Sequence, residues 1–397
     1  MGWLGEPLPR DQQAWATPFG PRCTKDHIEE LLFARRRDLF SGLDLVFFDT
    51  TSIYFEGQGG ESIGQYGHSK DKRPDRRQMV VGAVLDTTGR PICCELWPGN
   101  TTDVKTLIPI VDRLRARFSI ARICIVADRG MISRQTIQEL QAAHRDTRFI
   151  LGARLRAVKE IREKVLADPQ PYQEVYGPKV HSKDPAPLQV KEVRIADRRY
   201  IVCHNPDQAK KDRADREAIV ESLRDQLKRS DKSLIGNKGY RKFLKAVAGK
   251  RFEIDTAKVD AEARFDGIWV LQTDTTVPLV DVALRYKELW MVEAVFRSLK
   301  SVLETRPIYH KRDDTIRGHV FCSFLALVLL KELRGRMKAC GWRPEWERLK
   351  DDLEALEEIT VVTAGKTLVI RSQTRGDAGK ALAAVGVALG PAIRLAP

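Results

Sequence analysis

Three residues spaced seven apart, Tyr286, Glu293 and Lys300, place a carboxylate between two side chains that can hold phosphate. On an α-helix a seven-residue step turns the side chain by only about 20°, so the three residues are expected on one face. Apolar residues such as Leu289 and Phe296 put the core-facing side of that helix on or beside the same face. An unpaired acid near a core is costly, and a metal ion at Glu293 would remove the cost.

Two further acids, Asp49 and Asp128, each close an apolar stretch that is typical of a buried strand. A single acid at a strand end is usually a turn former, but strand ends in an open α/β sheet also face the crevice where ligands bind. If the two strands are neighbours, the carboxylates converge, and they stay ionised together only around cations such as Mg²⁺ or Mn²⁺. Two such ions about 4 Å apart can support phosphodiester cleavage.

The charge of the chain favours a polyanionic partner. Lys and Arg number 68 against 54 Asp and Glu, which gives a formal net charge of +14, although a basic globule without such a partner is the alternative. The stretch 210–251 carries 14 Lys or Arg, either as a solvated helical face or as a DNA contact. The loop after the first strand, solvated or lying along a DNA backbone, adds Lys70, Lys72, Arg73, Arg76 and Arg77.

The sequence indicates neither secretion nor a membrane. Its seven cysteines include no CxxC pair, so we expect neither a disulfide framework nor a zinc site, and the reducing cytoplasm is the expected setting. The first twenty residues lack the basic start and apolar run of a signal peptide. The longest apolar run, 320–330, is too short to span a bilayer and predicts a buried helix.

The order of expected elements predicts a mixed α/β fold. One helix over 25–40 precedes strands over 43–48, 78–85 and 91–97, followed by a helix, a strand ending before Asp128, a helix and a strand. The pattern then changes to short strands and a charged helical stretch, which indicates an insertion; a separate linked domain is the alternative. We divide the chain into a lead-in (1–42), the first part of the core (43–154), an inserted β-rich and basic subdomain (155–265), the second part of the core with the Glu-bearing helix (266–335), and a C-terminal helix and hairpin region (336–397).

Five segments in order resemble the DDE transposases of bacterial insertion sequences. They are FDTTS around Asp49, YGHSKDKRPDRRQ at 66–78, PGNTTDVKT at 98–106, VADRGM at 126–131, and the stripe from Tyr286 to Lys300. No single segment is decisive, but five in order are highly specific. The resemblance implies an RNase H-like mixed sheet with flanking helices and a β-rich insertion between the second and third acids.

The resemblance also implies roles for individual residues. Asp49, Asp128 and Glu293 would be catalytic and would ligate two Mg²⁺ ions, for which Mn²⁺ could substitute. Tyr286 and Lys300 match the family's tyrosine–arginine–glutamate–lysine signature and would contact DNA phosphates. Leu289 stands where that signature has arginine, which removes a bidentate phosphate contact. The first acid also comes early in the chain, as in a truncated copy whose lead-in is the remnant of a DNA-binding region.

The function implied is cut-and-paste transposition. Metal-dependent hydrolysis at the ends of an insertion sequence would free a 3′-hydroxyl, which then attacks target DNA. The partners would be double-stranded DNA, both terminal inverted repeats and target, and a second copy of the chain in a synaptic complex, at the bacterial nucleoid. Two alternatives are a regulatory or inactive copy that binds DNA or a full-length transposase without cutting, and a structure-selective RNase H-like nuclease.

Other polar and aromatic residues have structural interpretations. Asp103 is expected to be a first-turn helix charge, Glu95 to have a packing role in a strand, and Trp290 to lie in the core. AGKT at 364–367 lacks the earlier glycine and the following helix of a phosphate-binding loop, so we expect no nucleotide site there.

Overall fold

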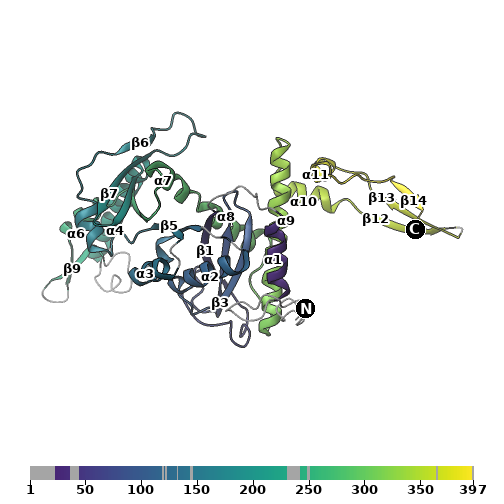
Figure 1. Cartoon of the computed structure of the whole chain (residues 1–397), viewed down its shortest axis with the longest axis horizontal. Coiled ribbons are helices and arrows are strands. Elements are labelled where there is room, and N and C mark those ends of the chain that lie inside the picture. Colours follow the sequence, from purple (N-terminus) through teal and green to yellow (C-terminus); the bar gives the residue numbers. More distant parts are fainter. Residues whose placement is uncertain are drawn as a thin grey trace.

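A nine-stranded mixed sheet forms the centre of the molecule, with the strand order β3-β2-β1-β4-β5-β11-β8-β7-β6 (Figure 1). The first five strands are β1 (Asp44–Tyr54), β2 (Gln78–Leu85), β3 (Pro91–Pro98), β4 (Ile123–Ala127) and β5 (Thr147–Gly152). The computed structural model describes residues 23–35, 44–118, 120, 123–131, 133–143, 146–229, 242–247, 251–363 and 365–395.

Strands β1, β4 and β5 run parallel, and β2 and β3 continue from β1 as an antiparallel meander. A hairpin turn at 86–89 joins β2 to β3, in which the Asp86 carboxylate accepts hydrogen bonds from the turn and Gly89 adopts a φ of +76°. The mixed sheet with a parallel centre and flanking helices confirms the RNase H-like α/β fold.

Strand β1 is longer than the 43–48 expected from its apolar run. It continues to Tyr54 because residues 50–54 pair with β2, whereas its pairing with β4 ends at Phe48. The sequence pattern does not show this pairing, since it depends on a strand some thirty residues further along the chain. Asp49 therefore lies within β1, at the point where its neighbour β4 stops, and the expectation that it closes the strand is wrong.

The segment 155–265 extends the same sheet. Strand β11 (Ile268–Thr273), which follows the segment, pairs with β5 on one side and with β8 on the other. The segment is thus joined to the core by sheet hydrogen bonds, while its domain division remains a prediction. Its elements are the π-helical turn Ile161–Val165, β6 (Gln173–Tyr176), β7 (Leu188–Ile195), β8 (Arg198–His204), α4 (Pro206–Arg229), β9 (Leu244–Val247), β10 (Arg251–Ile254) and α6 (Thr256–Ala263).

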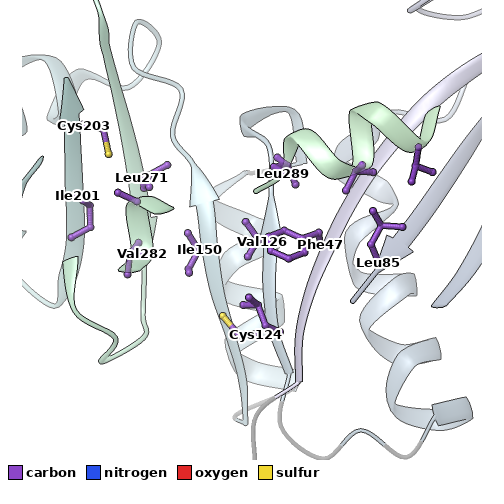
Figure 2. Close-up of a cluster of buried hydrophobic side chains, with 14 of the residues drawn as sticks. Phe47, Leu85, Cys124, Val126, Ile150, Ile201, Cys203, Leu271, Val282 and Leu289 are labelled. Atoms are coloured by element: carbon purple, nitrogen blue, oxygen red, sulfur yellow. The ribbon is translucent and has the colours of Figure 1, made fainter. Parts of the chain in front are cut away.

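Helices cover both faces of the first five strands. The alternation of side chains along β1 sends Val46 and Phe48 to one face, where α2 (Leu107–Phe118) and α3 (Arg134–Ala143) pack. Phe47 points to the other face, toward the helix that begins near Leu289 (Figure 2), and three helices cover that face. These are α7 (Leu279–Lys287), α8 (Trp290–Arg297) and α9 (Asp313–Ala339).

Helix α9 contains the apolar run 320–330, and most of that run is buried, as predicted. No helix in the described part of the chain combines the length and the apolar character needed to cross a membrane. After α9 come α10 (Trp346–Glu354), α11 (Ala378–Ala384) and a separate antiparallel sheet of β12 (Glu358–Thr363), β13 (Lys366–Arg371) and β14 (Ile393–Leu395). A strand rather than a helix follows Gly365, in keeping with the absence of a phosphate-binding loop there.

Helix α1 (Thr24–Ala34) is joined to the sheet through one buried acid. Glu29 is fully buried, accepts a hydrogen bond of 3.0 Å from the backbone N–H of Cys94, and pairs with Arg117 at 2.7 Å and Lys25 at 3.0 Å. Glu95, expected to have a packing role, also pairs with Arg117, at 3.3 Å. The rest of the lead-in, and with it the question of a DNA-binding remnant, lies outside the described residues.

Replacing Glu29 with alanine should lower the free energy of unfolding by about 3 kcal/mol, because two buried cations lose the acid that they share. Chemical denaturation followed by tryptophan fluorescence measures the change. The control is Glu139→Ala on the exposed side of α3, which should change stability by less than about 0.5 kcal/mol. Equal effects of the two substitutions would contradict an anchoring role for Glu29.

Candidate active site

The carboxylates of Asp49 and Asp128 lie side by side because β1 and β4 are parallel neighbours. Their pairing ends with Phe48 opposite Ala127, so the next residue of each chain segment is an acid at the same edge of the sheet. Both acids line a cavity of about 330 Å³, and Glu293 from α8 lines the same cavity. The fold therefore brings together the three predicted acids from β1, from the residue that follows β4, and from α8.

Tyr286, at the end of α7, reaches this cavity and orients Asp128. Its hydroxyl donates a hydrogen bond of 2.9 Å to Asp128 Oδ1. Gly152, at the end of β5, makes room for it, since a Cβ atom there would lie 2.3 Å from the Tyr286 hydroxyl oxygen. In this structure the tyrosine that the signature assigns to phosphate thus contacts a catalytic candidate directly.

The stripe of Tyr286, Glu293 and Lys300 does not follow one continuous α-helix, and that expectation is wrong. Between α7 and α8 the backbone forms tighter bonds, with Leu289 N–H donating to the Tyr286 carbonyl at 3.1 Å. After α8 the chain widens into a π-helical turn over Ser298–Val302. Tyr286 and Glu293 still line one cavity, but the π-helical turn changes the rotation per residue, so Lys300 leaves the face that they share.

Lys300 lines a second cavity, of about 670 Å³, where it pairs with Asp71 at 2.7 Å. Arg306 pairs with the same carboxylate at 2.6 Å, and the Asp71 side chain is only 4% exposed. Burial lowers the pKa of the Lys300 ammonium, while its bond to Asp71 opposes that shift. Arg73, Tyr54 and Tyr309 complete a cationic and aromatic lining.

Lys70, predicted to be a DNA contact, faces the acids of the site. Its Nζ donates to the Thr50 carbonyl at 2.7 Å and lies 3.1 Å from Asp103 Oδ2 and 3.8 Å from Asp49 Oδ1. Asp103 also accepts a hydrogen bond of 2.6 Å from the Thr50 hydroxyl. It occupies the first turn of a short helix, as expected, but it belongs to the site network too. Its motif, PGNTTDVKT, was the only signal for this in the sequence.

The other loop cations differ in their surroundings. Arg73 forms two hydrogen bonds to Asp75, and Arg76 pairs with Glu56 at 2.7 Å. Arg77 lies over the ring of Tyr66 and Lys72 is exposed at a turn. A role for these four residues in DNA binding remains a prediction.

Leu289 and Trp290, which lie between Tyr286 and Glu293 in the chain, differ in their exposure. Leu289 is 8% exposed and packs on the core with Val126 and Phe47 (Figure 2), while its edge lines the acidic cavity. Trp290, expected in the core, is 62% exposed and also lines the cavity. The tight turn before α8 gives Leu289 the inward position, so the indole faces outward at the mouth.

The electrostatics of the site favour a bound cation. Burial, with the nearby charges of Asp128 and Asp103, raises the pKa of Asp49 to about 6, although Lys70 and the backbone N–H of Thr50 oppose the shift. A buried carboxylate with acidic neighbours is stabilised in its charged form by a divalent ion, and carboxylate oxygens are the ligands that Mg²⁺ and Mn²⁺ prefer. The residues present therefore fit such an ion.

A second acidic cluster has a different character. Within the part of the chain that the structure describes, one set of three His, Cys, Asp or Glu side chains has its ligand atoms all within 4.8 Å of one another. The set is Asp26, Glu29 and Glu95. Lys25 and Arg117 already neutralise them, at distances of 2.7 to 3.7 Å. That cluster is an ion-pair network that joins α1 to the sheet, so it supplies no alternative metal centre.

Comparison with known proteins identifies the family. A family model described as the transposase DDE domain matches residues 40–329, well over half of the chain, and the match includes all three acids. The chain belongs to the DDE transposase family. The matched DDE domain ends within α9, so α10, α11 and the sheet β12–β14 lie beyond it.

Two solved transposase structures are similar to this DDE transposase over part of their length. A piggyBac transposase, in a synaptic complex with hairpin DNA, has 10% identity and a TM-score of 0.39, over 76% of this chain and 49% of that one. The Mos1 mariner transposase, in a paired-end complex with Mn, has 17% identity and a TM-score of 0.19, over 36% of this chain and 44% of that one. This chain spans about half the length of each. A comparison with curated proteins finds no match.

The raised pKa of Asp49 predicts a stability that depends on pH. Because the folded state favours the protonated acid, its ionisation destabilises the fold as pH rises from about 4 to about 6, and the full cost, about 3 kcal/mol, applies above pH 6. Asp49→Asn should therefore stabilise the metal-free protein by about 2–3 kcal/mol at pH 8 and by almost nothing at pH 4.

Denaturant unfolding across that pH range, with a chelator present, measures this difference. Asp197→Asn, at the exposed turn between β7 and β8, is the control and should leave stability within about 0.5 kcal/mol throughout. A constant difference between wild type and Asp49→Asn from pH 4 to pH 8 would rule out an energetic penalty from ionised Asp49.

Proposed function

We propose that this DDE transposase cuts DNA at the ends of an insertion sequence in a metal-dependent reaction and joins the freed 3′-hydroxyl to target DNA. The observation that carries the proposal is the convergence of Asp49, Asp128 and Glu293 on one cavity. Phosphodiester cleavage needs carboxylates that hold metal ions and cationic side chains that bind phosphates, and both kinds of side chain lie at this edge of the sheet.

The protein's own residues prepare this site. Asp49, Asp128 and Glu293 would hold two divalent ions, which when bound supply Lewis acidity for activating water or a hydroxyl and for stabilising the departing oxygen. Tyr286 fixes the orientation of Asp128 through its hydrogen bond. Lys70 holds Asp49 and Asp103 together, and its positive charge offsets part of their repulsion. No covalent enzyme intermediate is required.

The surroundings of the cavity provide surfaces for DNA. The exposed indole of Trp290 at the mouth can stack on a base, and the cavity with Lys300 and Arg306 offers cations to the backbone. Helix α4 and its neighbours carry the basic stretch that begins at Lys210, of which 230–241 and 248–250 lie outside the described residues. We propose terminal repeats and target DNA as ligands, two copies of the chain in the synaptic complex, and the bacterial nucleoid as the setting.

A copy that binds DNA without cutting is the second candidate, and Leu289 favours it. The core position of Leu289 means that the signature's arginine charge is missing beside the acids, and Lys300 is held by Asp71. Both features weaken phosphate binding at the cleavage site and leave the acids intact. A nuclease selective for branched DNA is the third candidate, and it would not need particular end sequences.

Nicking of a terminal-repeat duplex in Mg²⁺ or Mn²⁺ tests the proposal. Asp49→Asn, Asp128→Asn and Glu293→Gln should each lower the rate at least about 100-fold, because each removes a ligand charge from the metal site. The matched control is Glu288→Gln, a neighbouring glutamate outside the cavity lining, which should retain most of the activity.

Other results of that assay would point elsewhere. Wild-type protein that binds the duplex but fails to nick it in either metal supports the non-cutting copy. Equal cleavage of branched DNA with unrelated ends supports the nuclease. Undiminished nicking by any one of the three variants removes that residue from the site.

Tyr286→Phe should raise the metal concentration needed for half-maximal nicking by about 10- to 100-fold, because the ring still packs but Asp128 loses its orienting hydrogen bond. Titration of the nicking rate with Mg²⁺ measures this shift. Tyr309→Phe, at the exposed edge of the second cavity, serves as the control. If Tyr286 acts only on DNA, the duplex affinity falls and the metal requirement stays the same.

A further inference from the structure

The loop between β1 and β2 places an acid among the cations of the second cavity. Asp71 Oδ1 lies 2.7 Å from the Lys300 ammonium and 2.6 Å from the Arg306 guanidinium. The Asp71 side chain is only 4% exposed, and all three residues line the cavity. A carboxylate of the chain itself therefore already binds the two cations that the cavity offers to an anion from outside.

The other oxygen of this carboxylate is poorly accommodated. Asp71 Oδ2 is buried and has no hydrogen-bond partner in the part of the chain that the structure describes. A buried charged oxygen without a donor is costly. Lys72, the next residue, adds a second cost, because its φ of +58° lies in the left-handed region that residues other than glycine rarely adopt. The two cations thus hold Asp71 in place against two unfavourable features.

The residue before Asp71 makes the reverse contact at the acidic site. Lys70 Nζ lies 3.1 Å from Asp103 Oδ2 and 3.8 Å from Asp49 Oδ1, and the Lys70 backbone N–H donates to Ser52 Oγ at 2.8 Å. Two consecutive residues of one loop therefore give a cation to the acids and an acid to the cations. A DNA phosphate accompanied by a divalent ion would bring the same two charges to the same two places.

A phosphodiester suits the two cations better than Asp71 does. Asp71 offers the same oxygen, Oδ1, to Lys300 and to Arg306. A backbone phosphate has two free oxygens, so it can give one to each cation, and the planar guanidinium of Arg306 matches phosphate geometry. Burial lowers the pKa of the Lys300 ammonium even beside Asp71, so a close anion helps to keep this group charged.

We propose that Asp71 is an internal competitor of DNA, which holds Lys300 and Arg306 in the free protein and loses both cations to a backbone phosphate when DNA binds. Asp71 is a positioning residue, because it acts through the two cations and contacts no reacting group. The inference rests on the proposed function, since its ligand is a DNA strand. The contact lowers the affinity of the free protein for DNA, because it must break before the phosphate can bind.

Fluorescence anisotropy with a labelled terminal-repeat duplex, in the presence of a chelator, is the first test. Asp71→Asn tightens binding at least about 10-fold, because the phosphate no longer competes with a carboxylate for two cations. Glu304→Gln is the matched control. Glu304 lines the same cavity but forms no ion pair with either cation among the described residues, so its loss tightens binding by at most about 3-fold, through long-range charge alone.

A double-mutant cycle shows whether Asp71 acts through Lys300. In a Lys300→Met background, which removes one of the two disputed cations, the gain from Asp71→Asn shrinks at least about 3-fold. A gain of full size in that background means that Asp71 acts by another route and overturns the proposal. Thermal melts confirm that the variants fold.

Hydrogen exchange of wild-type protein tests the displacement without any substitution, and it decides the question if Asp71→Asn does not fold. The loop 69–73 is held by hydrogen bonds from the backbone N–H groups of Lys70 to Ser52 and of Arg73 to Ser69. Departure of Asp71 loosens this loop, so its peptide exchanges faster with the duplex than without it.

Three results overturn the proposal. They are exchange in the loop that stays the same or slows with DNA, a gain from Asp71→Asn no larger than that from Glu304→Gln, and no binding of the duplex by wild type and Asp71→Asn alike. Nicking by the three acids is a separate readout. Binding limited by Asp71 without any nicking contradicts the catalytic proposal alone, whereas acid-dependent nicking with no gain from Asp71→Asn contradicts this inference alone.

Discussion

The parallel pairing of β1 with β4 is the constraint on which the site depends. It puts two carboxylates at adjacent positions on the sheet edge, where burial and the nearby charge of Asp128 oppose the ionisation of Asp49. Neighbouring groups stabilise the carboxylates: the Lys70 ammonium lies between Asp49 and Asp103, and the Tyr286 hydroxyl donates a hydrogen bond to Asp128. Gly152 on the next strand is small because the tyrosine needs the space. The site is thus assembled at some cost to stability, which a bound cation would offset.

The segment 155–265, between the second and third acids, does not interrupt the sheet edge that carries Asp49 and Asp128. Its strands continue the sheet away from β1, and β11 brings the chain back beside β5, next to the point where α7 begins. From there the tight turn between α7 and α8 places Tyr286 and Glu293 in the same cavity while Leu289 remains in the core. The irregular backbone at this junction therefore matters as much to the site as the residue types do.

The sequence predicts the fold well, because continuous apolar runs mark β1 and β4 and ordered motifs mark the family, and the three acids chosen from it line one cavity. It misses features that depend on contacts between distant segments. Asp49 lies within a strand rather than at its end, since pairing with β2 extends β1 to Tyr54. Trp290 is exposed and Lys300 turns to Asp71, because short tight and wide turns break the seven-residue period that the pattern assumes. Such departures leave no trace in composition or spacing.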